Sequence, residues 1–509
     1  MNITTNTKRH ADFGARAFIV LLLPLGFLTI SDIFQGDFWY DFALTIIAAC
    51  CCWAILFLWK LPIRRYPHVY VFLAFYLIGY FVKFYVLAYL VLHGETYWEY
   101  LDVYYRLERQ ILEDYWTVTL CYEISTIGLL CATLSVGVLK IFERSDFGNP
   151  SGALVERGGF NFSNQVIRGA LVFTVVLFLL LLFIQIWLGL GFVSGAEREQ
   201  VQLPFRLAGI IAAIYRFVLP LLFLTLLWIS DQRNEKIWRW TLTMFIVYGL
   251  ASGLHSTSKA FFPTVIVLVG LLWIMTNRFS LRRFALLAGL VVLMLPFNTL
   301  LSVNRVLRVL RDDVDIFELA GLAWSVIYDS KTSQEYVGIF HSDLTRSVTE
   351  ILGPLMRING ADTLLNIANF GPTFSVPRVV HYLFESETAV NMEYATKVLG
   401  LPLEAGLAFS PSLMGYFYFI LGDPVLSGLA LMVFLLFWNT VFVLLNHSGF
   451  KLRPVIFATL LISFAHYLSE GTLESMPMNI ALVLTIGAAF EIGLRLVGPS
   501  IRTARAPTS

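Results

Sequence analysis

Charged residues are scarce in this sequence. Asp, Glu, Lys and Arg make up 14% of its 509 residues, whereas hydrophobic residues make up 58%. Soluble proteins carry roughly a quarter charged residues, so the deficit excludes an ordinary soluble domain and favours an integral membrane protein. The 36 basic and 35 acidic residues nearly cancel, and a net charge of +1 provides no general attraction for nucleic acid. We therefore expect no nucleic-acid partner.

Cysteines and motifs for cofactors are equally sparse. The five cysteines, Cys50, Cys51, Cys52, Cys121 and Cys131, all lie inside apolar runs, so neither a disulfide framework nor a metal-ligand pair is visible. The sequence also lacks a phosphate-binding GK[ST] loop and the HExxH, GxSxG and CxxC patterns. These absences argue against an ATP-driven machine and a zinc site, and we predict no metal and no cofactor.

Long apolar runs dominate what is present. A run of roughly 17 to 25 apolar residues is long enough to cross a bilayer as a helix. About twelve such runs lie near 14–31, 40–59, 70–92, 116–140, 169–193, 207–229, 239–254, 260–276, 284–302, 424–446, 454–468 and 478–496. The first follows Lys8, Arg9 and His10 without a small-residue cleavage site, which favours a retained span. The predicted fold is an all-α polytopic membrane protein with one membrane domain over 1–509.

The distribution of charge predicts how the spans are oriented. One set of alternate loops is basic, including Lys60 to Arg65, Arg278 to Arg283 and both termini. The other set is acidic, as at Asp32 to Asp41 and Glu470 to Glu474. Because short loops rich in Lys and Arg stay cytoplasmic, both termini are predicted to be cytoplasmic. The large loop 303–408 is then external, which in the inner membrane of a bacterium means periplasmic.

A short apolar segment follows the large loop. Residues 410–422 are too few to cross a bilayer, and Gly422, Asp423 and Pro424 would break a helix. Ser410 is expected to cap this helix and Pro411 to occupy its first turn. Irregular backbone at membrane depth is tolerated only inside protein or beside a wet cavity. We predict a re-entrant half-helix over 410–422, and helices within the large loop above it.

Cations at membrane depth are the first candidate site residues. Arg216 lies about ten residues into its span, roughly 15 Å from the end. Charges at such depth are costly and usually functional, so anion binding is the favoured role and an internal ion pair the alternative. Lys83 is either a similar group or a snorkelling lysine. A second set lies at the predicted outer rim, where the alternative is contact with lipid head groups: Arg198, Arg206, Lys259, Arg305 and Arg308.

Histidines supply candidates for a general base. Near its unperturbed pKa, a histidine can accept a proton from an attacking hydroxyl group. His341, in FHSDLTR, is the leading candidate. Its competitors are His255, His381, His466, Glu404, Glu470 and Glu474.

Four stretches together resemble the bacterial O-antigen polymerase family of oligosaccharide repeat-unit polymerases. They are GLHSTSKAF at 253–261, LMRINGADTLL at 355–365, FGPTFSVPRVV at 370–380 and LAFSPSLMGYFYFILGDPVLSGL at 407–429. The second and third would supply the cations Arg357 and Arg378. The chain departs from the family pattern at Lys259, where arginine is usual, and at Tyr416, where glutamate is common.

The resemblance implies a metal-independent glycosyltransferase. A glycan carried on undecaprenyl diphosphate would be transferred onto the next lipid-linked repeat unit at the periplasmic face, producing O-antigen or exopolysaccharide. Arg216, Arg378 and His341 would be catalytic. The substrate-binding residues would be Arg198, Arg206, Lys259, Arg305, Arg308 and Arg357. Membrane lipid and a chain-length regulator protein are the implied partners. The alternatives are an O-antigen ligase-type transferase, a flippase or transporter for the same lipid-linked oligosaccharide, and a non-catalytic scaffold.

Overall fold

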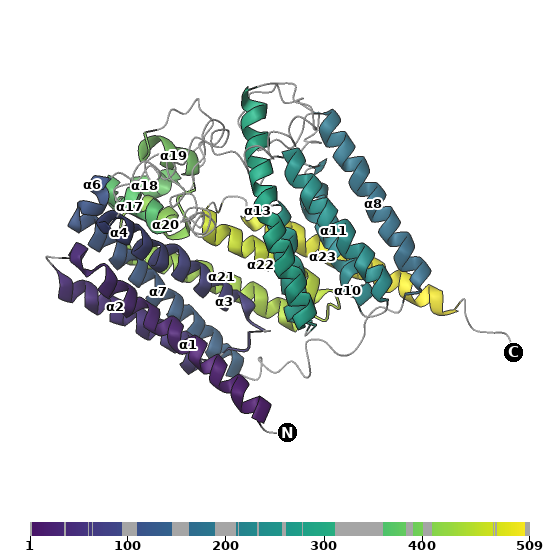
Figure 1. Ribbon diagram of the computed structural model, residues 1–509, viewed down its shortest axis with the longest axis horizontal. Coiled ribbons are helices and arrows are strands. Elements are labelled where there is room, and N and C mark those ends of the chain that lie inside the picture. The colour runs from purple at the N-terminus through teal and green to yellow at the C-terminus, as the bar shows by residue number, and fades with distance from the viewer. Residues whose placement is uncertain are drawn as a thin grey trace. The chain divides into compact units, whose positions relative to one another are not determined.

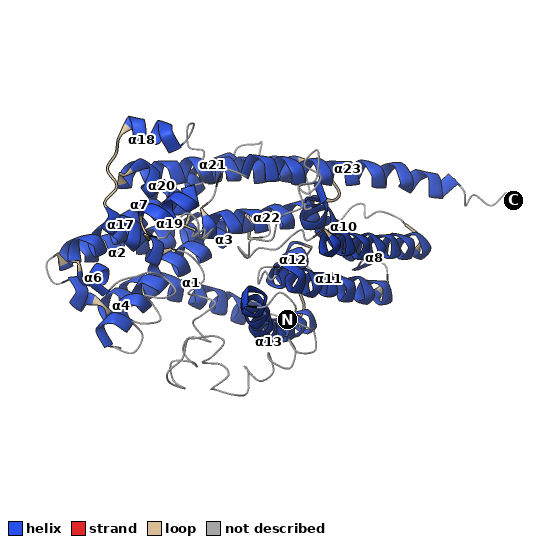
Figure 2. Cartoon of the chain, turned by 90° about the horizontal axis from the view of Figure 1, so that it is seen from above, coloured by secondary structure: helices blue, strands red, loops and turns tan. Residues whose placement is uncertain are grey.

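The described part of the chain is helical throughout. The computed structural model describes residues 3–34, 37–59, 61–63, 65–93, 109–144, 162–188, 210–211, 213–231, 234–256, 261–276, 278–310, 360–382, 390–400, 410–471, 473 and 476–503. Within these ranges there are helices and connecting loops but no strand (Figure 2). The chain divides into two compact units, each built from segments that are distant in the sequence. The predicted all-α fold is confirmed over these ranges.

The first unit comprises Met1–Ser151, Ser342–Leu444 and Phe464–Met476 (Figure 1). Its helices are α1 (Ile3–Thr29), η1 (Ser31–Phe34), α2 (Phe38–Trp53), η2 (Ala54–Trp59), α3 (Pro67–Tyr76), η3 (Leu77–Val82), α4 (Lys83–His93), α6 (Arg109–Glu113), α7 (Tyr115–Arg144), α17 (Ala361–Phe370), α18 (Val376–Val380), α19 (Val390–Lys397), α20 (Leu413–Leu421) and most of α21 (Pro424–His447). Aromatic rings from several helices form its core. Phe27, Phe34, Phe84 and Tyr122, for example, are buried and lie within ring contact of one another.

The second unit comprises Gly152–His341, Leu445–Ser463 and Pro477–Ser509. Its helices are α8 (Asn164–Trp187), η7 (Ile214–Val218), α10 (Leu219–Asp231), α11 (Glu235–Ser256), α12 (Phe261–Met275), α13 (Leu281–Leu310), the first part of α22 (Arg453–Glu470) and nearly all of α23 (Met476–Thr503). Helices α10, α11 and α12 pack against one another along the chain. Helix α13 continues to Leu310, so the first residues of the segment 303–408 are helical.

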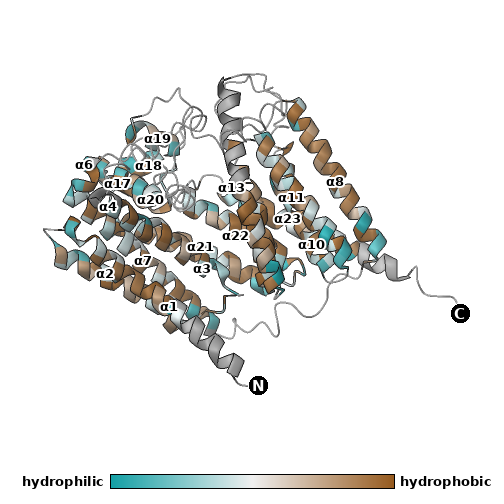
Figure 3. Ribbon diagram, viewed as in Figure 1, coloured by the Kyte–Doolittle hydropathy of each residue, from teal (hydrophilic) through white to brown (hydrophobic). Residues whose placement is uncertain are grey.

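The helices have the length and composition of membrane spans. Seven helical stretches of the described part are long and apolar enough to cross a bilayer: Phe38–Trp59, Pro67–Tyr89, Tyr115–Glu143, Asn164–Trp187, Ile214–Asp231, Pro424–His447 and Met476–Leu496. Arg16–Thr29, Phe261–Met275 and Arg453–Ser469 are shorter apolar helices. Most of α8 has the brown colour of hydrophobic residues in Figure 3. The chain is therefore a multi-pass membrane protein, while the predicted total of about twelve spans stays a prediction.

Helix α20 is a short helix enclosed by the first unit. All residues from Leu413 to Ile420 are buried, and Gly422 ends the helix in the left-handed conformation. The cap is Ser412 and not Ser410 as expected from the sequence, because the Ser412 side chain accepts a hydrogen bond from the Gly415 N–H. The break at Gly422 to Pro424 is confirmed, since α21 begins at Pro424. The dip of this helix into a membrane stays a prediction.

Candidate functional site

Helix α17 inserts part of the predicted large loop into the helical core of the first unit. Every residue from Ala361 to Ala368 is buried, and the helix contacts α4, α6, α7 and α20. It begins where Gly360 meets the backbone of Gly79, since a Cβ atom at Gly360 would overlap the Gly79 carbonyl oxygen. A glycine is therefore needed for this close approach.

A buried ion pair joins α17 to a membrane span. Lys83 Nζ lies 2.7 Å from Asp362 Oδ1, and both side chains are almost fully buried. Asp362 Oδ1 also accepts a hydrogen bond from the Gly360 N–H at 3.2 Å. Lys83 is thus not a snorkelling residue but half of an internal pair, as charges in a low-dielectric interior require.

Further hydrogen bonds connect α17 and the span segment η3 to α20 and its capping residue. Thr363 Oγ1 donates to Ser412 Oγ at 3.0 Å, and the Met414 N–H donates to the hydroxyl group of Tyr80 at 2.9 Å. Ser412 has a positive φ of 62°, which is unusual for a residue with a side chain. These contacts hold the strained residue at the start of α20, so the loop and the span together position this helix.

Arg378 lies directly beside α20. It follows Pro377 in the first turn of α18, where the Ser375 side chain caps the helix by accepting from the Arg378 N–H. Its guanidinium group donates from Nη2 to the Phe419 carbonyl oxygen at 2.6 Å. The same group lies over two rings, 5.3 Å from the centroid of Phe419 and 5.6 Å from that of Tyr382. Arg378 Nε is buried without an acceptor among the residues that the structure describes.

A second cation shares the Tyr382 ring. Lys397 Nζ lies 5.5 Å from the ring centroid and 3.4 Å from the hydroxyl group. Glu393, one helical turn earlier on α19, binds the same ammonium group at 2.6 Å and lies 3.7 Å from His381 Nε2. The hydrogen bond to Glu393 raises the pKa of the Lys397 ammonium group, so it stays charged at neutral pH. Burial and the Glu393 carboxylate raise the pKa of the Tyr382 hydroxyl group, which therefore stays neutral.

We call this set the Arg378 cluster: Arg378, His381, Tyr382, Glu393, Lys397 and Phe419. Two permanent cations face one aromatic ring, and among the described residues one carboxylate, that of Glu393, pairs with them. The cluster therefore carries a positive surplus. Arginine has five N–H donors, of which one binds an acceptor among the described residues, so the group has further capacity for an oxyanion.

Two exposed aromatic residues lie on the segment that leads from α17 to α18, and one of them contacts the cluster. Phe370, at the end of α17, and Phe374, before α18, are 41% and 50% exposed. The Phe370 ring lies 6.2 Å from the Phe419 ring. Flat aromatic faces are suited to apolar contact with ligand rings, while nearby cations bind anions. The arrangement can therefore accommodate a ligand that combines an anionic group with an amphipathic ring.

Arg216 belongs to the second unit, whereas Arg378 belongs to the first. Arg216 lies within the π-helical stretch η7, which interrupts regular α-helix, and its side chain is exposed. It makes no ion pair with a described residue, so the internal pair considered for it is not observed in this part of the chain. π-Helical turns inside helices often mark functional sites. Anion binding by Arg216 stays a prediction.

The other predicted site residues have no described side chains. Arg305 and Arg308 lie on α13, of which the structure describes only the backbone at those positions. Five lie outside the described residues: Arg198, Arg206, Lys259, Arg357 and His341. The convergence of these cations stays a prediction. Residues that the sequence did not point to are Asp362, Tyr382, Glu393 and Lys397.

The fold and its charged groups define a class of protein. The chain is a polytopic helical membrane protein in which a buried ion pair attaches the segment between two spans to the core. Comparison of the chain with protein-family models, with curated proteins and with solved structures found no match. No group of three or more His, Cys, Asp or Glu side chains suited to a metal ion occurs in the ranges described above.

Proposed function

We propose that this protein is a membrane glycosyltransferase that polymerises lipid-linked oligosaccharide repeat units. The Arg378 cluster is the observation that carries the proposal. Arg378 and Lys397 lie against the same Tyr382 ring although like charges repel. Glu393 balances one of them, and the remaining positive charge is suited to an anionic ligand. A sugar diphosphate combines that charge with a ring able to contact Phe370 or Phe374.

The reaction would transfer a glycan between two lipid carriers. A hydroxyl group on the terminal sugar of one repeat unit attacks the anomeric carbon of the glycan on the other carrier. A new C–O glycosidic bond forms and the C–O bond to the diphosphate breaks, with its electron pair leaving on the diphosphate. The hydroxyl proton passes to a protein base. In this scheme Arg378 stabilises the charge that develops on the diphosphate oxygens.

Contacts with Phe419 orient the Arg378 guanidinium group for this role. Its contact with the Phe419 carbonyl and its position over the Phe419 ring determine the direction of the guanidinium plane. A group held in place before the reaction needs no reorganisation as charge develops, which is why such groups lower barriers. His381, beside Glu393, is the described candidate for the base, whereas His341 lies outside the described residues.

Substitution of Arg378 tests the proposal. In cells that make the polysaccharide, Arg378→Ala should leave glycans of a single repeat unit, because removal of one charge-stabilising donor costs roughly 100-fold to 1,000-fold in rate. Arg378→Lys should retain partial chain length, since lysine keeps the charge but not the planar fork. Gel analysis of glycan length, with immunodetection of the protein in membranes, measures both effects.

The matched control is Arg239→Ala. Arg239 is an exposed arginine that pairs with Glu235 on α11, remote from the cluster in sequence and in the second unit. It should keep the full ladder. Ladders of normal length from Arg378→Ala, at normal protein level, would remove Arg378 from the site. Full-length chains that accumulate on the lipid carrier would instead identify a ligase.

A further inference from the structure

The α12–α13 turn, by which we mean residues 278–284 and so include the first turn of α13, interleaves cationic and apolar residues on the surface of the second unit. It reads Arg278, Phe279, Ser280, Leu281, Arg282, Arg283 and Phe284. Leu281 is 83% exposed, and Phe279 and Phe284 are also exposed. Exposed apolar residues interleaved with arginines are typical of backbone that lies at a membrane–water interface.

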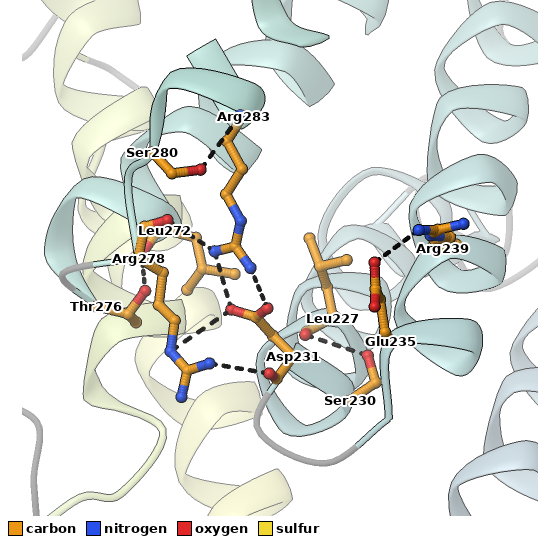
Figure 4. A network of polar contacts seen from close by, with 10 residues as sticks. All are labelled: Leu227, Ser230, Asp231, Glu235, Arg239, Leu272, Thr276, Arg278, Ser280 and Arg283. Carbon is orange, nitrogen blue, oxygen red and sulfur yellow. Dashed lines mark hydrogen bonds and ion pairs between the residues drawn. The ribbon is translucent and has the colours of Figure 1, made fainter. Parts of the chain in front are cut away.

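Asp231 fixes the position of this turn (Figure 4). It is the last residue of α10, and both of its carboxylate oxygens bind the Arg283 guanidinium group. Arg278 donates from Nη1 to the Asp231 carbonyl oxygen at 3.0 Å, and Arg283 donates to the Arg278 carbonyl oxygen at 2.9 Å. The end of α10 therefore holds the connection between α12 and α13 in a defined conformation.

Two tryptophans complete the support. Arg283 lies 5.2 Å from the ring centroid of Trp238 and 5.0 Å from that of Trp273. Trp273 is almost fully buried, and its indole N–H has no acceptor among the described residues. The Trp238 N–H is likewise buried without an acceptor there. The two indole rings therefore help to hold the Arg283 guanidinium group in place.

The turn also has uncompensated charge. Of its three arginines, Arg278 and Arg283 pair with the carboxylate of Asp231, and Arg282 adds a further positive charge that no described carboxylate balances. Arg283 donates two hydrogen bonds to that carboxylate. Arg278 remains 45% exposed, and Arg282 is exposed and makes no ion pair with any residue of the described ranges.

We propose that the α12–α13 turn binds the head group of an anionic phospholipid. Arg278 and Arg282 contact its phosphate, Leu281 and Phe284 enter the acyl region, and Arg283 positions the turn through Asp231. The location fits, because a stretch long enough to cross the bilayer, Ile214–Asp231, ends at the same carboxylate. The proposal is independent of the glycosyltransferase assignment and requires only that the chain is a membrane protein.

Lipid titration of the full-length protein tests this site. The protein in mild detergent is titrated with dioctanoyl phosphatidylglycerol, and bound lipid is counted by native mass spectrometry. Arg282→Gln should weaken binding about fivefold, which is the ratio that ~1 kcal/mol per cation near an anionic surface gives. Dioctanoyl phosphatidylcholine, which is zwitterionic, should bind the parent and the variant equally.

Lys236→Gln is the matched control. Lys236 is exposed at the start of α11, directly after the chain leaves Asp231, so the substitution removes one positive charge near the same helix end. It should change phosphatidylglycerol binding less than twofold. Leu281→Ser, which keeps every charge, should also weaken binding, because the acyl contact is lost. Equal losses in Arg282→Gln and Lys236→Gln, or no loss in Arg282→Gln, would overturn the proposal.

Discussion

At the scale of single residues, the Lys83–Asp362 pair is a costly arrangement because both charges are buried. Two charges are removed from water, and their attraction at 2.7 Å offsets much of that cost. Breaking such a pair by removing one partner leaves an uncompensated buried charge. The position of α17 in the core therefore depends on Lys83, which lies almost 280 residues before Asp362 in the chain.

Single and double substitutions of this pair give an ordered prediction. Lys83→Met alone and Asp362→Asn alone should each lower the free energy of unfolding. We expect a loss of roughly 3–5 kcal/mol for Lys83→Met, because it leaves an unpaired carboxylate buried. The double variant should be more stable than Lys83→Met. Thermal unfolding in detergent measures all three. Independent, additive losses in the double variant would show that the two groups do not interact.

The sequence pointed to half of this pair and half of the Arg378 cluster. Lys83 stands out because a cation inside an apolar run needs an explanation, whereas Asp362 lies in a polar stretch where a carboxylate is ordinary. Arg378 was predicted from a resemblance, but Glu393 and Lys397 follow after a gap that no local pattern bridges. Contacts between residues so far apart are decided by tertiary packing, and helical periodicity in the sequence does not predict them.

At the scale of secondary structure, α20 depends on close backbone contacts. Gly471 has a φ of 70°, and a Cβ atom there would overlap the Ser412 carbonyl oxygen. That oxygen accepts the Tyr416 N–H at 2.8 Å in the first turn of α20. The start of α20 is therefore packed against Gly471, which lies just beyond the end of α22.

Alanine substitution measures how much the close contact between Gly471 and Ser412 contributes to stability. Gly471→Ala should destabilise the first unit by more than ~1 kcal/mol, because the new methyl group is both strained and in collision. Gly169→Ala is the control, since a Cβ atom at Gly169, within α8, meets nothing within 4 Å. That variant should be neutral or slightly stabilising. Equal melting temperatures for the two variants would contradict the described packing.

Helix positions were predictable and helix irregularities were not. The apolar runs located helices such as α7 and α21 because lipid-facing and core-facing residues are both apolar. Two π-helical stretches have no sequence signature that we recognised. They are η3, which ends just before Lys83, and η7, which contains Arg216. Such turns are rare interruptions of α-helices, and helical periodicity in the sequence does not locate them.

At the scale of the whole molecule, the orientation in the membrane is the prediction with the widest consequences. Short-loop lysines and arginines predict cytoplasmic termini and an external segment 303–408. Alkaline phosphatase fused after residue 340 should be active, while a fluorescent protein fused after Ser509 should fluoresce, because each reporter works on one side only. The reverse pattern would put the Arg378 cluster on the cytoplasmic side and exclude transfer at the external face.

Turnover of the purified protein tests the central claim most directly. The substrate is a lipid-linked repeat unit isolated from cells that make the polysaccharide, and the assay contains a metal chelator. We expect products of two or more repeats from the parent protein and none from Arg378→Ala at equal melting temperature. Repeat units that remain single with the parent protein, with and without added magnesium, would contradict the proposed polymerase.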